Sequence, residues 1–488
     1  MAENKQFGSS FRSALTWNML NIGVGQVMTL GIFLLLTTQL SPAVFGIFAL
    51  ALVFVDFFNF EGRYSIIDAI VQKQRFDKVS LSTCFWVTFA IFASFAALFY
   101  AIAPLVANLF GYQDITGVLR ALSLTLLIVP FSIVPMAVLN QRRDFKNMTL
   151  RIIFARTIGG ISALVVAFGP HPEWALVVQR VMANSAEAVL LITQTRIFPS
   201  LRFDRVWAKE FGRTALGIYF AQTTAKSLLR SLDIIIASFL GVVAVGLWRI
   251  AERIMQAVFS AFANPISSLW VILLSATDTD AEEKSKIFLN LTQLGVVILV
   301  PVFIGIGLIS QDFIDAFVGS EFNAVGPILG LLGLFGSMAP FYNFRNAVLI
   351  ALKKTPTLIK LALVDLVLLL LLCIALRGFG IMGLVSALGV VYLVSTVLFM
   401  PIVLKEVNVK LGALIERILP AYLAGLIMGL SVLALTPMMA DLASVWQIGV
   451  KALLGVVIYF GYLLIFHRAW LQRLFKVLLD RETQMKPA

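Results

Sequence analysis

The sequence predicts an all-α membrane protein whose chain crosses a lipid bilayer about fourteen times. Of its 488 residues, 60% are hydrophobic and 13% are charged, and the mean hydropathy is +0.95. A soluble fold cannot bury that much apolar surface in one core. Apolar runs of about 20 residues recur and can cross a hydrocarbon layer of about 30 Å, whereas the alternating ten-residue segments of an outer-membrane barrel are missing. The fold class is therefore polytopic and all-helical.

Fourteen apolar segments follow one another, each about as long as a membrane-crossing helix. The eighth contains Asn264 and Pro265. A kink or break is expected there, because proline lacks the N–H that continues a helix. The segments cover about 14–38, 43–60, 81–109, 118–139, 149–168, 174–196, 214–240, 242–274, 286–310, 325–351, 357–376, 380–403, 418–436 and 446–466.

Basic residues alternate between successive loops. The N-terminus, Met1 to Arg12, is polar and has no cleavage signal, so the first segment is interpreted as a start-transfer helix. With this end in the cytoplasm, Lys and Arg concentrate in the loops assigned to the inside, among them Arg63 and Arg151. The outside loop from Gln311 to Asn323 has none. The positive-inside rule then predicts two cytoplasmic termini and an even number of spans.

A weak internal repeat divides the chain. Leu40 to Gly46 resembles Leu240 to Gly246 at an offset of about 200 residues, and each follows a long span across a short turn. Both copies start from the same side of the membrane. Two parallel six-helix lobes, with a site between them, are a transporter architecture. The predicted domains are an N-terminal lobe at 1–200, a cytoplasmic linker at 201–213, a C-terminal lobe at 214–404 and, at 405–488, a helix pair with a basic tail in which Gly425 and Gly429 suit close helix contact.

The stretch from 214 to 274 carries unusual charge for a membrane-spanning region. A charge near the bilayer centre costs about 2.5–3.5 kcal/mol, so several together indicate a protein-lined or watery interior. Lys226, Arg230 and Asp233 are spaced as one helix face, and the next span repeats the pattern. Two interpretations stay open, a functional cavity or structural ion pairs such as Arg230 with Asp233. The charged residues are Lys226, Arg230, Asp233, Arg249, Glu252 and Arg253.

Polar residues in other spans extend this pattern. Arg180 and Glu187 lie in the sixth span and could face the same cavity. A deep carboxylate such as Glu187, Asp233 or Glu252 could carry a proton for ion coupling, although a neighbouring arginine would oppose protonation. Asp56, Arg345 and Asp365 fall toward the cytoplasmic ends of their spans. There, long side chains reach the interface easily, so interfacial placement is expected for these three.

Several classes of function are disfavoured. Cys84 and Cys373 both lie in apolar spans, which leaves no disulfide framework and no metal cluster. No phosphate-binding loop or zinc motif occurs, and no loop exceeds about twenty residues, so neither a cofactor nor a soluble catalytic domain is expected. The net charge of +12 is spread among the loops. Membrane orientation accounts for this charge better than nucleic-acid binding does.

Several motifs resemble one known family. They are Leu40-Ser41-Pro42 with Phe45-Gly46, Ala69 to Lys73, Leu81 to Trp86, Leu139 to Lys146, Gly159-Gly160, Glu173 to Val177 and Leu201 to Phe203. In these the chain resembles the polysaccharide transporter family, the Wzx-like lipid-linked oligosaccharide flippases and exporters. That family belongs to a superfamily that also contains multidrug extruders and lipid II flippases. The resemblance covers the N-terminal half by motif and the second half by pattern.

The resemblance implies that the protein moves a polyprenyl-diphosphate-linked saccharide across the bacterial inner membrane by alternating access. Arginine offers a planar, permanently charged partner for a diphosphate. The predicted substrate-binding residues are Lys226, Arg230, Arg249, Arg253 and Arg180, and the residues considered for ion or proton coupling are Asp233, Glu252 and Glu187.

Two alternatives remain. An ion-coupled multidrug extruder of the same superfamily would favour a cavity rich in carboxylates, and a membrane glycan ligase or transferase would need a catalytic external loop. Neither feature is evident. The expected partners are the lipid-linked saccharide, the bilayer and downstream polymerase or export machinery, with no nucleic acid. No enzymatic activity is predicted.

Overall fold

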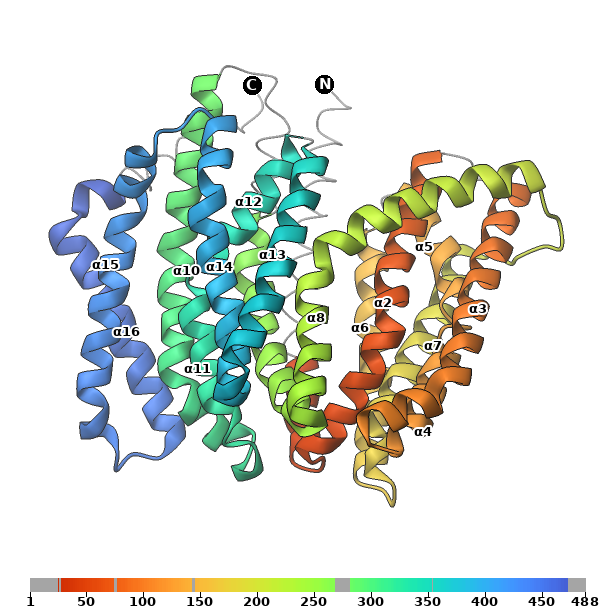
Figure 1. The fold of residues 1–488 in the computed structure, drawn as a ribbon, viewed down its shortest axis with the longest axis horizontal. Helices are drawn as coiled ribbons and strands as arrows, with labels where there is room; N and C mark the ends of the chain where they lie inside the picture. Colours follow the sequence, from red (N-terminus) through yellow and green to blue (C-terminus); the bar gives the residue numbers. More distant parts are fainter. Residues whose placement is uncertain are drawn as a thin grey trace. The chain divides into compact units, whose positions relative to one another are not determined.

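The structure is a computed structural model that describes residues 25, 28–73, 77–142, 145–267, 281–352 and 354–472. Every regular element within these residues is helical, which confirms the predicted all-α class. The chain forms two compact units, Met1–Arg249 and Ile250–Ala488, here called unit 1 and unit 2 (Figure 1). The predicted lobes, which meet at 201–213, stay a prediction.

Unit 1 is a bundle of long helices. The helix pair α6 and α7 packs closely, α3 packs on α4, and α2 packs on α4 and α5. A short apolar helix, Met28–Thr37, precedes them. The elements are α2 (Pro42–Lys73), α3 (Lys78–Phe110), α4 (Asp114–Thr125), α5 (Pro130–Arg142), α6 (Phe145–Ala167), α7 (Ala175–Thr195) and α8 (Arg205–Val258), whose last residues belong to unit 2.

Helix α8 contains the turn predicted between the seventh and eighth spans. Gly241 has φ 79° and ψ 179°, so the helical path breaks there. Glycine is required, because residues with a Cβ strongly disfavour positive φ. Toward the N-terminus, the predicted linker is helical from Arg205, and the apolar side chains of Trp207 and Phe211 are buried. In Figure 1 these first turns run crosswise to α2 and α3.

The two halves of the weak sequence repeat contact each other inside unit 1. A Cβ on Gly46 would lie 1.8 Å from the carbonyl oxygen of Val242, and one on Gly246 would lie 2.0 Å from that of Pro42. The N-terminal turns of α2 therefore meet α8, just after Gly241, backbone to backbone. Small residues permit such close helix contacts in membranes, where the hydrophobic effect does not drive helices together.

Unit 2 is organised around a long helix. Helix α10 packs against α11, α15 and α16, and these helices run side by side (Figure 1). A Cβ on Gly425 of α15 would lie 2.7 Å from the Val300 side chain of α10. The glycine therefore permits the close contact between these two helices. The elements are α10 (Ala281–Phe317), α11 (Val325–Gly336), α12 (Ala339–Ala351), α13 (Thr355–Leu376), α14 (Gly380–Glu406), α15 (Leu411–Leu435) and α16 (Ser444–Phe466).

The irregularity expected near Asn264 and Pro265 is present as a π-helical turn. Phe259–Ala263 is π-helical, and the N–H of Asn264 donates to the carbonyl of Phe259, five residues back. Such a turn widens the helix just ahead of the proline. Many π-turns of this kind lie at functional sites.

Membrane spans are visible as long apolar helices. In the described ranges, eight helical stretches are long and apolar enough to cross a membrane, or nine with the pair α4 and α5, which is bent by 44°. One of the eight, Pro356–Glu406, comprises both α13 and α14. The protein is thus a multi-pass membrane protein. The number of spans and the sides of the termini stay predictions.

Two loop assignments from the sequence are wrong. Arg63 lies inside α2, which continues to Lys73, and Arg151 lies inside α6, which begins at Phe145. A counter-charge explains both, because each arginine is paired with Glu187. A helix can carry a charge into the membrane-spanning region when a buried partner compensates it.

Candidate functional site

The described part of the predicted charged stretch of α8 contains a well-defined ion pair. Arg249 Nη2 lies 2.6 Å from Asp233 Oδ2, and Trp248 Nε1 donates to Asp233 Oδ1 at 3.0 Å. The pair joins the two sides of the Gly241 break. Lys226 and Arg230 lie in the same helix, but their side chains are outside the described residues.

A second pair connects α2 with α7. Arg180 Nη2 lies 2.5 Å from Asp56 Oδ1. The Arg180 side chain is 30% exposed, whereas that of Asp56 is 8% exposed. The expected interfacial placement of Asp56 is therefore wrong. Its carboxylate lies inside the bundle because Arg180 supplies the opposite charge.

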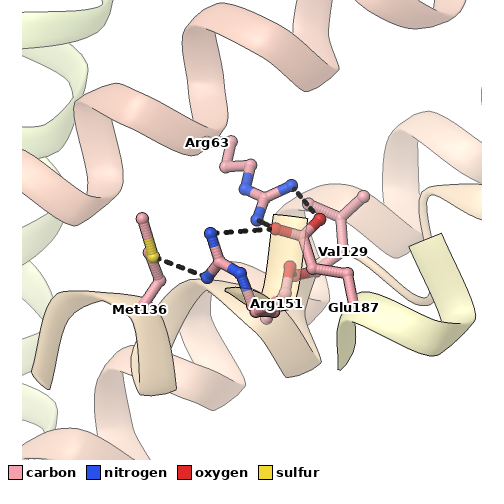
Figure 2. A network of polar contacts seen from close by, with 6 residues as sticks. Arg63, Val129, Met136, Arg151 and Glu187 are labelled. Atoms are coloured by element: carbon pink, nitrogen blue, oxygen red, sulfur yellow. Dashed lines mark hydrogen bonds and ion pairs between the residues drawn. The ribbon is translucent and has the colours of Figure 1, made fainter. Parts of the chain in front are cut away.

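A third group surrounds Glu187. Arg63 Nη2 and Nη1 donate to the two Glu187 oxygens at 2.7 Å and 2.9 Å, which is a bidentate arrangement. Arg151 Nη2 lies 3.5 Å from the same carboxylate. Its Nη1 contacts the Met136 sulfur at 2.8 Å. Figure 2 shows the two guanidinium groups converging on Glu187 from different helices.

The second and third groups together form a two-rung ladder of charges between α2 and α7. Asp56 and Arg63 are seven residues apart on α2, and Arg180 and Glu187 are seven residues apart on α7, so each pair shares a helix face. Each rung joins residues 124 apart in sequence, which requires the two helices to run in the same direction. Along α2 the acidic residue comes first and the basic residue second, whereas along α7 the basic residue comes first.

Several arginines of unit 1 lie at these contacts. Arg63, Arg151, Arg180 and Arg249 pair with the carboxylates of Glu187, Asp56 and Asp233. Two buried donors of α7, Arg180 Nε and Asn184 Nδ2, have no hydrogen-bond acceptor among the described residues. Buried donors without acceptors are unfavourable. An anion or water beside α7 would satisfy them.

Unit 2 contains ion pairs of a different kind. Arg345 Nη2 lies 2.9 Å from Asp365 Oδ2, with side chains only 2% and 0% exposed. Arg345 also contacts the Ser395 hydroxyl and lies over the Tyr342 ring at 4.3 Å. The expected interfacial placement of Arg345 and Asp365 is thus wrong, because they compensate each other inside the unit. Lys451 and Asp312 form a similar pair at 2.6 Å.

The remaining predicted residues lie at the start of unit 2. Glu252 and Arg253 are half-buried in the last turns of α8. Cys84 and Cys373 are buried thiols. Within the described residues, no group of three or more His, Cys, Asp or Glu side chains could hold a metal ion.

An apolar pocket lies among α10, α15 and α16 of unit 2. Its volume is about 350 Å³. Side chains such as Val302, Ile306, Met428 and Phe460 line it, and Lys451 is the one charged residue in the lining. This pocket has the chemistry of a hydrocarbon-binding site.

The fold is similar to that of solved membrane transporters. It superposes on a solved structure of the lipid II flippase MurJ in an inward closed conformation with a TM-score of 0.75, at 16% identity, covering 93% of this chain and 99% of that one. An inward-facing MATE-family multidrug resistance transporter of the MOP superfamily matches with a TM-score of 0.58, at 14% identity, over 78% of this chain and 94% of that one.

The chain belongs to the polysaccharide biosynthesis protein family, whose model matches residues 35–327. It is 23% identical over 311 residues to the succinoglycan biosynthesis transport protein ExoT of Rhizobium meliloti, covering 64% of this chain and 63% of that protein. It is 22% identical to the lipopolysaccharide biosynthesis protein WzxC of Escherichia coli, over 67% and 68% of the two chains. The match thus spans under two thirds of the length of ExoT. The resemblance found in the motifs is confirmed.

Proposed function

We propose that this protein moves a polyprenyl-diphosphate-linked saccharide precursor across the bacterial inner membrane. The relatives are named for transport or biosynthesis of succinoglycan and lipopolysaccharide, and the fold is that of a lipid II flippase. All of these names concern saccharides assembled at membranes. A transporter, and not an enzyme, is the function that these similarities support.

The observation that carries the proposal is a set of partly exposed arginines inside the apolar helices of unit 1. Arg63, Arg180 and Arg249 lie in apolar helices, yet their side chains are 17%, 30% and 20% exposed to solvent. A diphosphate is a dense anion with many acceptor oxygens, which suits arginine donors. The free Nε of Arg180 and Nδ2 of Asn184 add two donors of the required kind. These residues, with Lys226, Arg230 and Arg253, are the proposed path of the diphosphate.

The proposed topology has fourteen spans, with two parallel six-helix lobes at 1–200 and 214–404, a linker at 201–213 and an appended pair at 405–488. Both termini are cytoplasmic in this proposal. The two lobes would give access to each side of the membrane in turn, as expected of parallel repeats. Downstream polymerase or export machinery would take up the product. Cysteine-accessibility labelling of each loop would test the number of spans.

A leaflet-protection assay tests the proposed function. Purified protein is placed in liposomes with a labelled polyprenyl-diphosphate oligosaccharide, and the rate at which the headgroup becomes reachable from the opposite side is measured. The double variant Arg180→Gln/Asp56→Asn removes one ladder pair without changing net charge. It should slow flipping at least tenfold, about 1.4 kcal/mol. Neutralising Arg230 or Arg253 should have the same effect.

The matched control is Arg345→Gln/Asp365→Asn, which removes an ion pair of unit 2 that is sealed from solvent. Flipping per folded molecule should stay within twofold of the unmodified protein. Equal rates for all variants would reject the proposed diphosphate path. No acceleration by folded protein would favour the multidrug extruder, because MATE transporters share the fold. A pH or sodium jump with small organic cations would then measure that activity, with Asp233, Glu252 and Glu187 as the candidate coupling groups.

A further inference from the structure

A second pocket lies in unit 1, away from the charge ladder. It has a volume of about 510 Å³ and is bounded by α3, α5, the end of α7 and the segment that follows α7. Its floor is apolar and aromatic, with Phe85, Phe131 and Phe198 among the lining residues. Phe85 and Phe131 pack edge to face at 5.1 Å, which gives the floor a defined shape.

The mouth of this pocket is positively charged. Lys78, Arg142 and Arg196 line it, and the lining contains no carboxylate. All three side chains are exposed, and none has an acidic partner among the described residues. They come from the first residue of α3, the last residue of α5 and the residue after α7. Three helix ends thus place three cations at one boundary of the apolar region, on the side that the basic loops predict to be cytoplasmic.

The segment behind the mouth is held in place by α3. The Ser82 hydroxyl donates to the carbonyl of Ser200, and Trp86 Nε1 donates to the same oxygen at 2.8 Å. The hydroxyl of Ser200 itself is buried and has no hydrogen-bond partner among the described residues. Ser200 lines the pocket. The pocket is therefore a built cavity that still has one unsatisfied polar group.

Arg196 is held in an unfavourable backbone conformation. Its φ is 54° and ψ is 30°, in the left-handed region, where it caps α7 through its N–H to the carbonyl of Ile192. Glycine is the usual residue at this position, because a Cβ is disfavoured there. Outliers of this type concentrate at ligand-binding positions. The arginine at this position therefore costs backbone stability relative to glycine.

We propose that this pocket binds one anionic phospholipid of the cytoplasmic leaflet, with its phosphate at Lys78, Arg142 and Arg196 and the start of its acyl chains on the phenylalanine floor. Basic pockets between transmembrane helices on the cytoplasmic side suit anionic headgroups, and each nearby Lys or Arg contributes to binding. A volume of about 510 Å³ is that of a site for one small ligand. This inference does not depend on the proposed transport activity.

Native mass spectrometry of the full chain in a neutral detergent tests this. The probes are dioleoyl phosphatidylglycerol and dioleoyl phosphatidylcholine, which have the same acyl chains and different headgroup charge. One phosphatidylglycerol should bind at least tenfold more tightly than phosphatidylcholine. Arg142→Gln and Arg196→Gly should each weaken phosphatidylglycerol binding about fivefold.

Arg196→Gly is the more informative variant because it relieves the positive φ. Its apparent melting temperature without lipid should equal or exceed that of the unmodified protein, so weaker lipid binding could not be attributed to misfolding. Arg202→Gly is the control, since Arg202 is an exposed arginine of the same segment that does not line the pocket. Its lipid affinity should not change.

Four results would overturn the proposal. Equal binding of the two phospholipids would remove the role of charge, and unchanged binding by Arg196→Gly and Arg142→Gln would place the lipid elsewhere. Displacement of phosphatidylglycerol by millimolar inorganic phosphate or preferential binding of undecaprenyl phosphate would identify a small-anion site or a substrate site in place of a phospholipid site.

Discussion

The Arg345–Asp365 pair of unit 2 and the ion pairs of unit 1 all join an arginine to a carboxylate, and they differ in their access to solvent. Arg345 and Asp365 of unit 2 are almost completely enclosed, at 2% and 0% exposure. In the pairs of unit 1, Arg63, Arg180 and Arg249 remain partly exposed, whereas Arg151, the second partner of Glu187, is 2% exposed.

This difference separates two uses of charge in a membrane protein. A sealed and balanced pair fixes the packing of helices and offers nothing to a ligand. A partly exposed pair can exchange its internal partner for an external anion. In the function proposed above, the same Coulomb attraction supports structure at Arg345 and Asp365 and binding at the arginines of unit 1, with burial deciding between the two uses.

The largest expected effect is at the sealed pair. Arg345→Met removes the only described counter-charge of Asp365 and should destabilise the protein by about 3–5 kcal/mol. Thermal unfolding in detergent would measure this. The double variant Arg345→Met/Asp365→Leu should recover most of the loss, since no charge then remains buried. If Arg180→Met at the partly exposed pair costs as much as Arg345→Met, the distinction between the units fails.

The next largest effect on stability is expected at a helix contact that involves no charged residue. Gly46→Ala would place a methyl group within 1.8 Å of the Val242 carbonyl oxygen. The contact between α2 and α8 must then separate, at a cost of about 1–3 kcal/mol. Gly212→Ala in α8 is a matched control, because a Cβ there meets nothing within 4 Å. A smaller loss for Gly46→Ala than for Arg180→Met would mean that the exposed ion pairs, and not the glycine contact, hold unit 1 together.

A smaller stability effect with a larger functional effect is expected at Arg63. Arg63→Gln should cost about 1 kcal/mol, because Arg151 still compensates Glu187. Flipping should nevertheless fall about tenfold or more, since a partly exposed guanidinium is lost. Arg63→Lys keeps the charge without bidentate geometry and should give an intermediate rate. Unfolding curves and leaflet-protection rates on the same preparations separate the two effects.

The smallest effect is at an exposed carboxylate outside both sets of pairs. Asp77 caps α3, and the backbone N–H and hydroxyl of Ser80 hold the pKa of Asp77 below its usual value of 3.8. A lowered pKa in the folded state adds stability above the unfolded-state value, which is lost as the pH falls through the folded-state value. Asp77→Ala should therefore cost at most about 1 kcal/mol at pH 7 and less near pH 3. Unfolding curves at both pH values would check this, and an unchanged cost at pH 3 would contradict the capping role.

Apolar runs were enough to predict an all-helical chain of long apolar helices, because their signal is local, but the single span predicted at 325–351 is divided into α11 and α12. Gly241 and Pro265 mark a break and an irregular turn that the structure contains. The charged partners were harder to predict, because Arg63 and Arg151 resemble loop residues until Glu187 is known to lie beside them. Their spatial neighbours are more than 30 residues away in sequence. One local signal was available, the seven-residue spacing that Asp56 with Arg63 shares with Arg180 and Glu187.

The ladder between α2 and α7 also affects the order in which helices enter the membrane during synthesis. Asp56 and Arg63 leave the ribosome 124 residues before Arg180 and Glu187. At about 5–20 residues per second, this delay lasts roughly 6–25 s. During that time α2 must wait at the headgroup level or beside the insertion machinery, since its charges have neither of the partners that α7 supplies. Completion of α7 is then the event that commits the first half of the chain to the membrane interior.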